Sequence, residues 1–394
     1  MMLPEGHGLY PGHPGLRGCV RFFNLSTGAF ARAHLPLLHD HVILDSVDGL
    51  LLLHHDHDTA VRLLHPFTGD ITDLPPLDSL MPQIQPHHIC YGLEDKGSIL
   101  RSVCAVVAVS ATGTINVVLA LYHLHRVAYA AAGDTRWVLS TWKLRSLMKP
   151  VAFQGKFYAM HGLYGPKYTI RINVIDPLRR HAGGSHSPSE PSPEKFVEWP
   201  RDKIAYYPVH LVECDSELLV VAYTDDSCAH LQVYRLADLM SSKMVPMASI
   251  GDHALFLGDR CLCLSPSTGK GLPSIIRNSI ICMHTCIRTI RDVGRDENCR
   301  LEQYHLDSGI WTPASDGDCV HKPPSNPCTL IHHIFTCCHR EYWNKGIIFC
   351  TQTEPVWLVK PNLRIGVLLD GLLSSLRSRG AMVDQAGLGR CLGG

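Results

Sequence analysis

Short apolar runs alternate with polar turns along most of the chain, and many of these turns end in glycine. The pattern Val20–Gly28 returns as Val61–Gly69, and related copies with an aromatic residue occur at Gly133–Trp137 and Leu301–Trp311. Repetition of this kind is typical of repeat architectures, because one small sheet cannot bury its faces alone. The first two turn glycines are 69 − 28 = 41 residues apart. This spacing is close to the roughly 40–50 residues of one β-propeller blade.

The longest apolar stretch, Val103–Tyr122, has about the length that a membrane span needs. The turn sequence Ser110–Thr114 interrupts it between two β-branched runs. We therefore expect a hairpin in which Val103–Val109 pairs with Ile115–Tyr122, and not a membrane span.

The same alternation predicts hairpins and third strands elsewhere. The expected segments are Leu50–Leu53 with Ala60–His65, Val151–Ala159 with Tyr168–Ile175, His210–Ala222 with Leu231–Leu236, and Ala254–Leu264 with Asn278–Met283 and Leu301–Leu306. The terminal alternating strands of the units number six, near Phe22, Leu63, Val118, Ile172, Val233 and Gln303. The sequence thus predicts an all-β propeller of about six blades, with five or seven as alternatives and with few residues for the first blade.

One propeller domain is expected over residues 16–360. Arg179–Glu194, rich in Ser, Pro and Gly, is expected to be a disordered loop within it. A further apolar hairpin, Gly346–Val359, is a candidate to pair with the strand near Val20 and close the ring. Residues 361–394 are expected to form an irregular C-terminal tail.

The net charge and the absence of a targeting signal limit the partners and the cellular location that we expect for this chain. The chain has 394 residues, with 36 Lys and Arg against 36 Asp and Glu. No net field favours nucleic acid or an anionic membrane, so neither is expected as a partner. The first residues lack a secretory signal, so an intracellular location, cytoplasmic or nuclear, is expected. The 16 cysteines are then expected to be mostly buried thiols and not a disulfide framework.

Familiar catalytic signatures are missing from the sequence. It contains no nucleophile elbow, phosphate-binding Gly-rich loop or His-Glu-x-x-His motif. Adjacent acids occur at Asp225–Asp226 and at Asp56 and Asp58, where solvated turns are the simpler interpretation. We therefore expect no catalytic residues and no cofactor.

Metal binding deserves a separate test because the chain has 25 histidines. The densest group comprises Cys328, His332, His333, Cys337, Cys338, His339 and Cys350. Its spacing matches no standard zinc motif, so we expect no metal ligands there. A second group, His54, His55 and His57, is expected in a solvated turn. Two cysteine pairs, Cys261 with Cys263 and Cys282 with Cys286, are expected to be packing residues.

Several segments, in order, resemble the plant F-box-associated, KIB-type β-propeller family. They are Asp45–Leu53, Ala60–Asp70 with Leu74–Pro76, Gly133–Trp137, Phe153–Ala159 and Ala254–Gly258. The resemblance covers roughly Val20–Trp311 and implies a kelch-like propeller. In family members this domain follows an N-terminal F-box and is thought to select proteins for ubiquitination. This chain has no room for an F-box before Val20, so docking onto a ligase scaffold is not expected.

Two classes of function are compatible with these features of the sequence. The favoured one is a non-enzymatic protein-interaction module that binds an unknown protein through loops at one face of the ring. The alternative is a propeller-based enzyme, which needs a metal site or two spaced carboxylates at the channel. A truncated family member without a selected function is a third possibility.

Overall fold

The computed structural model describes most of the chain up to Cys338. The described residues are 2–3, 17–24, 29–55, 57–85, 100, 103–144, 147–163, 169–178, 195–200, 209–224, 228–265, 275–284, 300–314 and 330–338. The predicted loop Arg179–Glu194, the hairpin Gly346–Val359 and the tail 361–394 lie outside these residues.

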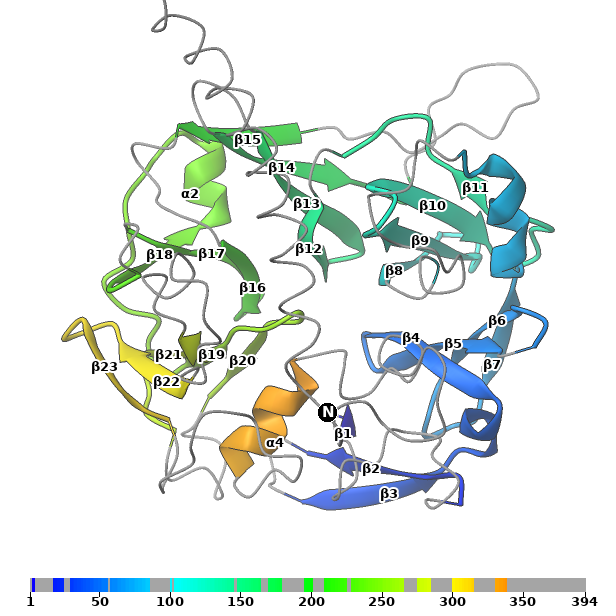
Figure 1. Ribbon diagram of the computed structural model, residues 1–394, viewed down its shortest axis with the longest axis horizontal. Coiled ribbons are helices and arrows are strands. Elements are labelled where there is room, and N and C mark those ends of the chain that lie inside the picture. Colours follow the sequence, from blue (N-terminus) through cyan, green and yellow to red (C-terminus); the bar gives the residue numbers. More distant parts are fainter. Residues whose placement is uncertain are drawn as a thin grey trace, which may run out of the picture.

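Six small sheets stand around a common centre (Figure 1). Sheet 1 contains β1 (Met2–Leu3), β2 (Cys19–Phe23) and β3 (Phe30–His34). Sheet 2 contains β4 (His41–Val47), β5 (Leu50–His55), β6 (Val61–Leu64) and β7 (Ile71–Leu74). Sheet 3 contains β8 (Val103–Val109), β9 (Ile115–Leu121), β10 (Arg126–Ala131) and β11 (Val138–Leu139).

The other three sheets complete the described ring. Sheet 4 contains β12 (Leu147–Phe153), β13 (Lys156–Leu163), β14 (Thr169–Ile175) and β15 (Lys195–Pro200). Sheet 5 contains β16 (His210–Cys214), β17 (Glu217–Tyr223) and β18 (Leu231–Arg235). Sheet 6 has the order β20 (Leu262–Leu264), β19 (Ala254–Phe256), β21 (Ser279–His284), β22 (Arg300–His305) and β23 (Ile310–Pro313).

Helices are short in the described part of the chain. They are the 3₁₀ helices η3 (Pro36–His39) and η4 (Leu77–Gln83) and the α-helices α2 (Leu236–Met240) and α4 (Leu330–Cys337). Even α4 has only 8 residues. None of the described helices has the length and hydropathy that a membrane crossing requires.

The hydrophobic cores lie between neighbouring sheets. In β8, the side chains of Val103, Ala105 and Val107 pack against sheet 2. Those of Cys104 and Val106 pack against sheet 4 on the other side. Successive strand residues point to opposite faces, so a strand with neighbours on both sides needs an unbroken apolar run. This burial explains the apolar stretch from Val103, which forms the predicted hairpin with Val103 opposite Leu121.

Tight turns join the two innermost strands in three of the sheets. The turn residues are Asp48–Gly49, Gln154–Gly155 and Asp215–Ser216, and all six have positive φ. Two successive positive φ values are typical of the two-residue hairpin turn that matches the strand twist. These turns hold the innermost strands β4, β12 and β16 in register with the strands outside them.

The aromatic residue of the repeated pattern joins one sheet to the next. The indole N–H of Trp137 in sheet 3 donates to the carbonyl of Pro75, just after sheet 2, at 2.6 Å. The indole N–H of Trp311 in sheet 6 donates to the carbonyl of Ala229, which lies next to sheet 5, at 2.8 Å. Each tryptophan therefore bonds to the preceding unit of the ring.

Sheet 6 departs from the regular pattern. The predicted hairpin Ala254–Leu264 is confirmed, with Ala254 opposite Leu264. However, β20 is the inner strand although it follows β19 in sequence, and β19 pairs with β21 in parallel. The result is a five-stranded sheet with one parallel pair. The alternating apolar runs had predicted antiparallel pairing throughout.

The two ends of the described chain meet beside sheets 1 and 6. Strand β1 pairs with β2, with Met2 opposite Phe22, so residues before Val20 contribute to the first sheet. Helix α4 lies beside β1 (Figure 1) and packs its Ile334 and Phe335 onto sheet 6. The sequence pattern did not predict this helix.

Candidate functional site

The ring has two faces, which the strand directions define. Because neighbouring strands in sheets 2–5 are antiparallel, successive turns lie alternately on opposite faces. We call the face with the turns Asp48–Gly49, Gln154–Gly155 and Asp215–Ser216 the turn face. The opposite face, which carries the β5–β6 turn, is the network face.

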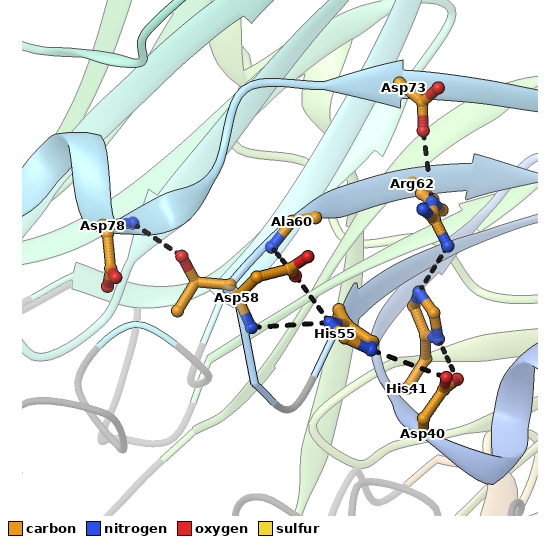
Figure 2. A network of polar contacts seen from close by, with 9 residues as sticks. Asp40, His41, His55, Asp58, Ala60, Arg62, Asp73 and Asp78 are labelled. Atoms are coloured by element: carbon orange, nitrogen blue, oxygen red, sulfur yellow. Dashed lines mark hydrogen bonds and ion pairs between the residues drawn. The ribbon is translucent and has the colours of Figure 1, made fainter.

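A polar network on the network face joins all four strands of sheet 2 (Figure 2). His41, at the start of β4, is buried and lies opposite His55. Its Nδ1 is 2.5 Å from Asp40 Oδ1, and the guanidinium of Arg62 donates to its Nε2 at 3.2 Å. Because a guanidinium only donates, His41 accepts at Nε2 and carries its proton on Nδ1.

His55 lies between two carboxylates in the same network (Figure 2). Its Nδ1 is 2.5 Å from Asp58 Oδ1 and its Nε2 is 3.5 Å from Asp40 Oδ2. Burial acts to raise the pKa of Asp40, but the hydrogen bond from His41 and the electrostatic interaction with His55 outweigh it and lower that pKa. The hydrogen bond from the backbone N–H of Ala60 lowers the pKa of Asp58, and the hydrogen bond with His55 lowers it further.

Arg62 extends the network to β7, where its Nε donates to Asp73 at 3.1 Å. Asp40, His41 and His55 lie close enough together to be metal ligands. The guanidinium of Arg62 occupies the Nε2 side of His41, however, and its positive charge opposes a cation there. The network therefore acts as a set of structural contacts across sheet 2.

The histidine cluster predicted for a solvated turn is placed differently. His54 and His55 belong to β5, and His54 is buried. Only His57 and Asp58 of the described residues lie in the turn. The expectation of a solvated His54–Asp58 tip is therefore wrong for the two histidines that the strand includes.

Acidic side chains gather on the turn face around the ends of the inner strands. Glu213 lies near the end of β16 with its side chain largely exposed. Partial burial of its carboxyl group raises its pKa, and the negative charge of Asp48 raises that pKa further. Gln154 donates to the carbonyl of Ser216 at 3.3 Å, so the turns of sheets 4 and 5 touch. Asp48, Glu213 and Asp215 thus place three exposed carboxylates at the inner strands of sheets 2 and 5.

Exposed apolar side chains occur farther out on the turn face. Phe67 is 65% exposed and Ile71 is 49% exposed, both at the β6–β7 turn. The ring of Phe67 lies 5.0 Å from that of Phe22 in sheet 1. The backbone N–H of Thr68 donates to His65 Nδ1 at 3.1 Å and the Thr68 hydroxyl donates to Asp70 at 2.6 Å. These contacts hold the aromatic side chain outward.

A group of thiols and a histidine lies between sheets 5 and 6 on the turn face. Cys214 ends β16, Cys263 belongs to β20, and His253 immediately precedes β19. Their ligand atoms all lie within 4.8 Å of one another. Sequence spacing did not reveal this group, because its members come from two sheets.

The other candidate residues are only partly described. In the group Cys328–Cys350, Cys337 and Cys338 are buried near the end of α4. Cys282 is buried with its sulfur 3.9 Å from the Tyr223 hydroxyl. Asp56, Asp225–Asp226, Cys286 and Cys350 lie outside the described residues.

A ring of small, mainly antiparallel sheets with cores between them defines a β-propeller. A family model described as the KIB1-4 beta-propeller matches residues 22–311. The match spans more than half of the 394 residues, and the chain therefore belongs to the KIB1-4 β-propeller family. This confirms the predicted all-β propeller and the KIB-type resemblance.

Two solved structures show a distant likeness to this chain. The β-propeller domain of Cps50 (Swd1) from Myceliophteria thermophila has 9% sequence identity and a TM-score of 0.30, with 75% of this chain and 77% of that chain covered. The N-terminal domain of Nup159 has 9% identity and a TM-score of 0.23, with coverages of 75% and 70%. No curated protein matched the sequence.

Proposed function

We propose that this chain is a non-enzymatic protein-recognition module that binds its target on the turn face. The family membership supports an interaction role in general terms. The observation that carries the choice of face is Phe67, a large aromatic side chain that is exposed yet fixed by its turn and by Phe22. A fixed aromatic anchor contributes to binding at a small cost in side-chain entropy.

The charge of the same face favours a particular kind of target. Asp48, Glu213 and Asp215 are exposed around the inner strands. Apolar side chains surround them farther out, namely Phe67, Ile71, Val109, Ile276 and Ile310. A protein segment with basic residues flanked by apolar ones complements this arrangement.

The resemblance to F-box-associated propellers supports a finer proposal. The bound protein is of the class that family members are thought to select for ubiquitination, and the chain supplies only the recognition surface for it inside the cell. No cofactor is required for such a role.

Affinity purification from plant cells with mass spectrometry tests the proposal. Tagged wild type is compared with Phe67→Ala and with His57→Ala, which changes an exposed residue of the opposite face. We expect Phe67→Ala to lower the recovery of specific partners at least tenfold and His57→Ala to leave it unchanged. Equal recovery with both variants would reject the turn face as the binding surface. Recovered partners that are themselves ubiquitinated in the cell would support the finer proposal.

A further inference from the structure

The thiol group on the turn face has the composition of a zinc site. Cys214 and Cys263 are both free thiols, and their sulfur atoms are 2.9 Å apart. This separation is longer than the ~2.05 Å of a disulfide bond. His253 adds an imidazole nitrogen, and all three ligand atoms lie within 4.8 Å of one another. Two thiolates and an imidazole are ligands that Zn²⁺ prefers.

His253 is oriented as a metal-bound histidine would be. Its Nδ1 is 2.9 Å from the backbone carbonyl of Ile250, which can only accept a hydrogen bond. Nδ1 therefore carries a proton, and Nε2, 3.1 Å from Asp215 Oδ1, donates to that carboxylate while no metal is bound. A metal ion at Nε2 would replace this second proton and leave the Nδ1 hydrogen bond in place. Metal-binding histidines almost always donate their second ring N–H to a carbonyl or carboxylate in this way.

The electrostatic surroundings also favour a cation. Glu213 and Asp215 flank Cys214 in the sequence, so two carboxylates accompany the thiols. The thiol of Cys263 donates to the sulfur of Cys214. Two thiolates beside these carboxylates would repel one another, and a divalent ion removes this repulsion.

We propose that Cys214, Cys263 and His253 bind one Zn²⁺ ion that links sheets 5 and 6. Two sulfurs at about 2.3 Å from a tetrahedral ion are about 3.8 Å apart, so the thiols need to separate by less than about 1 Å. Both thiols and Nε2 of His253 release their protons to solvent on binding. The fourth position is open to the Asp215 carboxylate or to water. This site is independent of target binding at Phe67.

The test uses the full chain, purified under reducing conditions and freed of metal. Titration with Zn²⁺ and elemental analysis after gel filtration should give one ion per chain. Cys214→Ser and Cys263→Ser should each weaken binding at least tenfold. Cys261→Ser is the matched control on the same sheet, since Cys261 lies 3.8 Å from His210 and outside the group. Cys350→Ser controls for the separate cysteine-rich segment, and both control variants should bind as wild type does.

A second measurement keeps the proposal testable if the serine variants fail to fold. In the wild-type chain, Zn²⁺ should protect Cys214 and Cys263 from iodoacetamide more than tenfold, as read by peptide mass spectrometry, while Cys261 is not protected. Co²⁺ should give a thiolate charge-transfer band. Less than one ion per chain, loss of binding in Cys350→Ser alone, or a Cys214–Cys263 disulfide in the reduced protein would each overturn the proposal.

Discussion

Two Arg–Asp pairs in this propeller have the same chemistry but very different surroundings. Arg260, from the β19–β20 turn, binds Asp45 of β4 near the centre of the ring, and Asp45 has a side-chain exposure of 0%. Arg62 binds Asp73 at the network face, where the carboxylate is 79% exposed. The central pair joins sheets 2 and 6, whereas the outer pair joins adjacent strands of one sheet.

The surroundings decide how much each pair matters. Asp45 also accepts a hydrogen bond from the backbone N–H of Ala105 in β8 at 2.7 Å. Arg260 donates its backbone N–H to the carbonyl of Cys338 at the end of α4, at 2.9 Å. Three sheets and the last described helix therefore meet at this pair. Exposed pairs contribute little, because water and salt screen them.

Removing the central guanidinium should have the largest effect. Arg260→Met leaves the Asp45 carboxylate in the interior without this cation and should lower the free energy of unfolding by about 4 kcal/mol. The matched outer variant, Arg62→Met, should cost less than about 1 kcal/mol. Urea unfolding monitored by circular dichroism measures both.

A double variant separates charge from packing at the central pair. Asp45→Asn combined with Arg260→Met removes both charges, so it should be more stable than Arg260→Met alone. A double variant that is less stable than the single one would show that the charge of Asp45 is not what destabilises Arg260→Met.

The second prediction concerns the close approach of sheet 6 and α4. A Cβ added at Gly258 would lie 2.5 Å from Cys338 Cβ and 2.6 Å from its carbonyl oxygen. Gly258→Ala should therefore cost about 3 kcal/mol, near the upper range for overpacking. At Gly155 no atom lies within 4 Å of such a Cβ, so Gly155→Ala should cost only about 1 kcal/mol through its positive φ. Equal losses in thermal unfolding would contradict the contact.

The third prediction concerns Trp137, a buried and uncharged side chain between sheets 2 and 3. Trp137→Phe removes the indole N–H that bonds the carbonyl of Pro75 and reduces the packed volume between sheets 2 and 3. We expect a loss of about 2 kcal/mol. Hydrogen exchange should show the loss first in β7 and β11. Val109→Ala, at an exposed position of the same sheet, is the control and should change little.

The smallest effect is expected at the network face, and it depends on pH. The pKa of Asp40 in the folded chain lies below its ordinary value of 3.8. Its contribution is therefore present above about pH 4 and is lost as the pH falls through the lower folded value. Asp40→Asn should reduce the urea midpoint slightly at pH 7, and the difference from wild type should shrink toward about pH 3. A difference that stays constant with pH would contradict the ionised role of Asp40.

The sequence predicted the strands well where burial imposes a regular pattern. The hairpin from Val103 was predictable because both faces of β8 are packed. The parallel pairing of β19 with β21 was not, since an apolar run of three residues carries no information about strand direction. Helix α4 was not predicted, because the cysteines and histidines of this segment were compared only with the spacing of zinc motifs. The buried residues Ile334 and Phe335, which form the apolar face of the helix, were not considered.

Candidate chemistry was harder to predict than the fold. Cys214 and Cys263 are 263 − 214 = 49 residues apart, and only the packing of β16 against β20 brings them together. No local motif records such a contact between inner strands. His54 was placed in a turn because histidine and aspartate alternate after it, yet its strand continues through His55.

The central pair also bears on the order of synthesis. Arg260 follows Asp45 by 215 residues, so at roughly 5–20 residues per second the ribosome adds it some ~10–40 s later. During this interval the growing chain holds an inner strand whose final neighbours do not yet exist. An ionised aspartate keeps that strand hydrated and discourages pairing with other nascent chains.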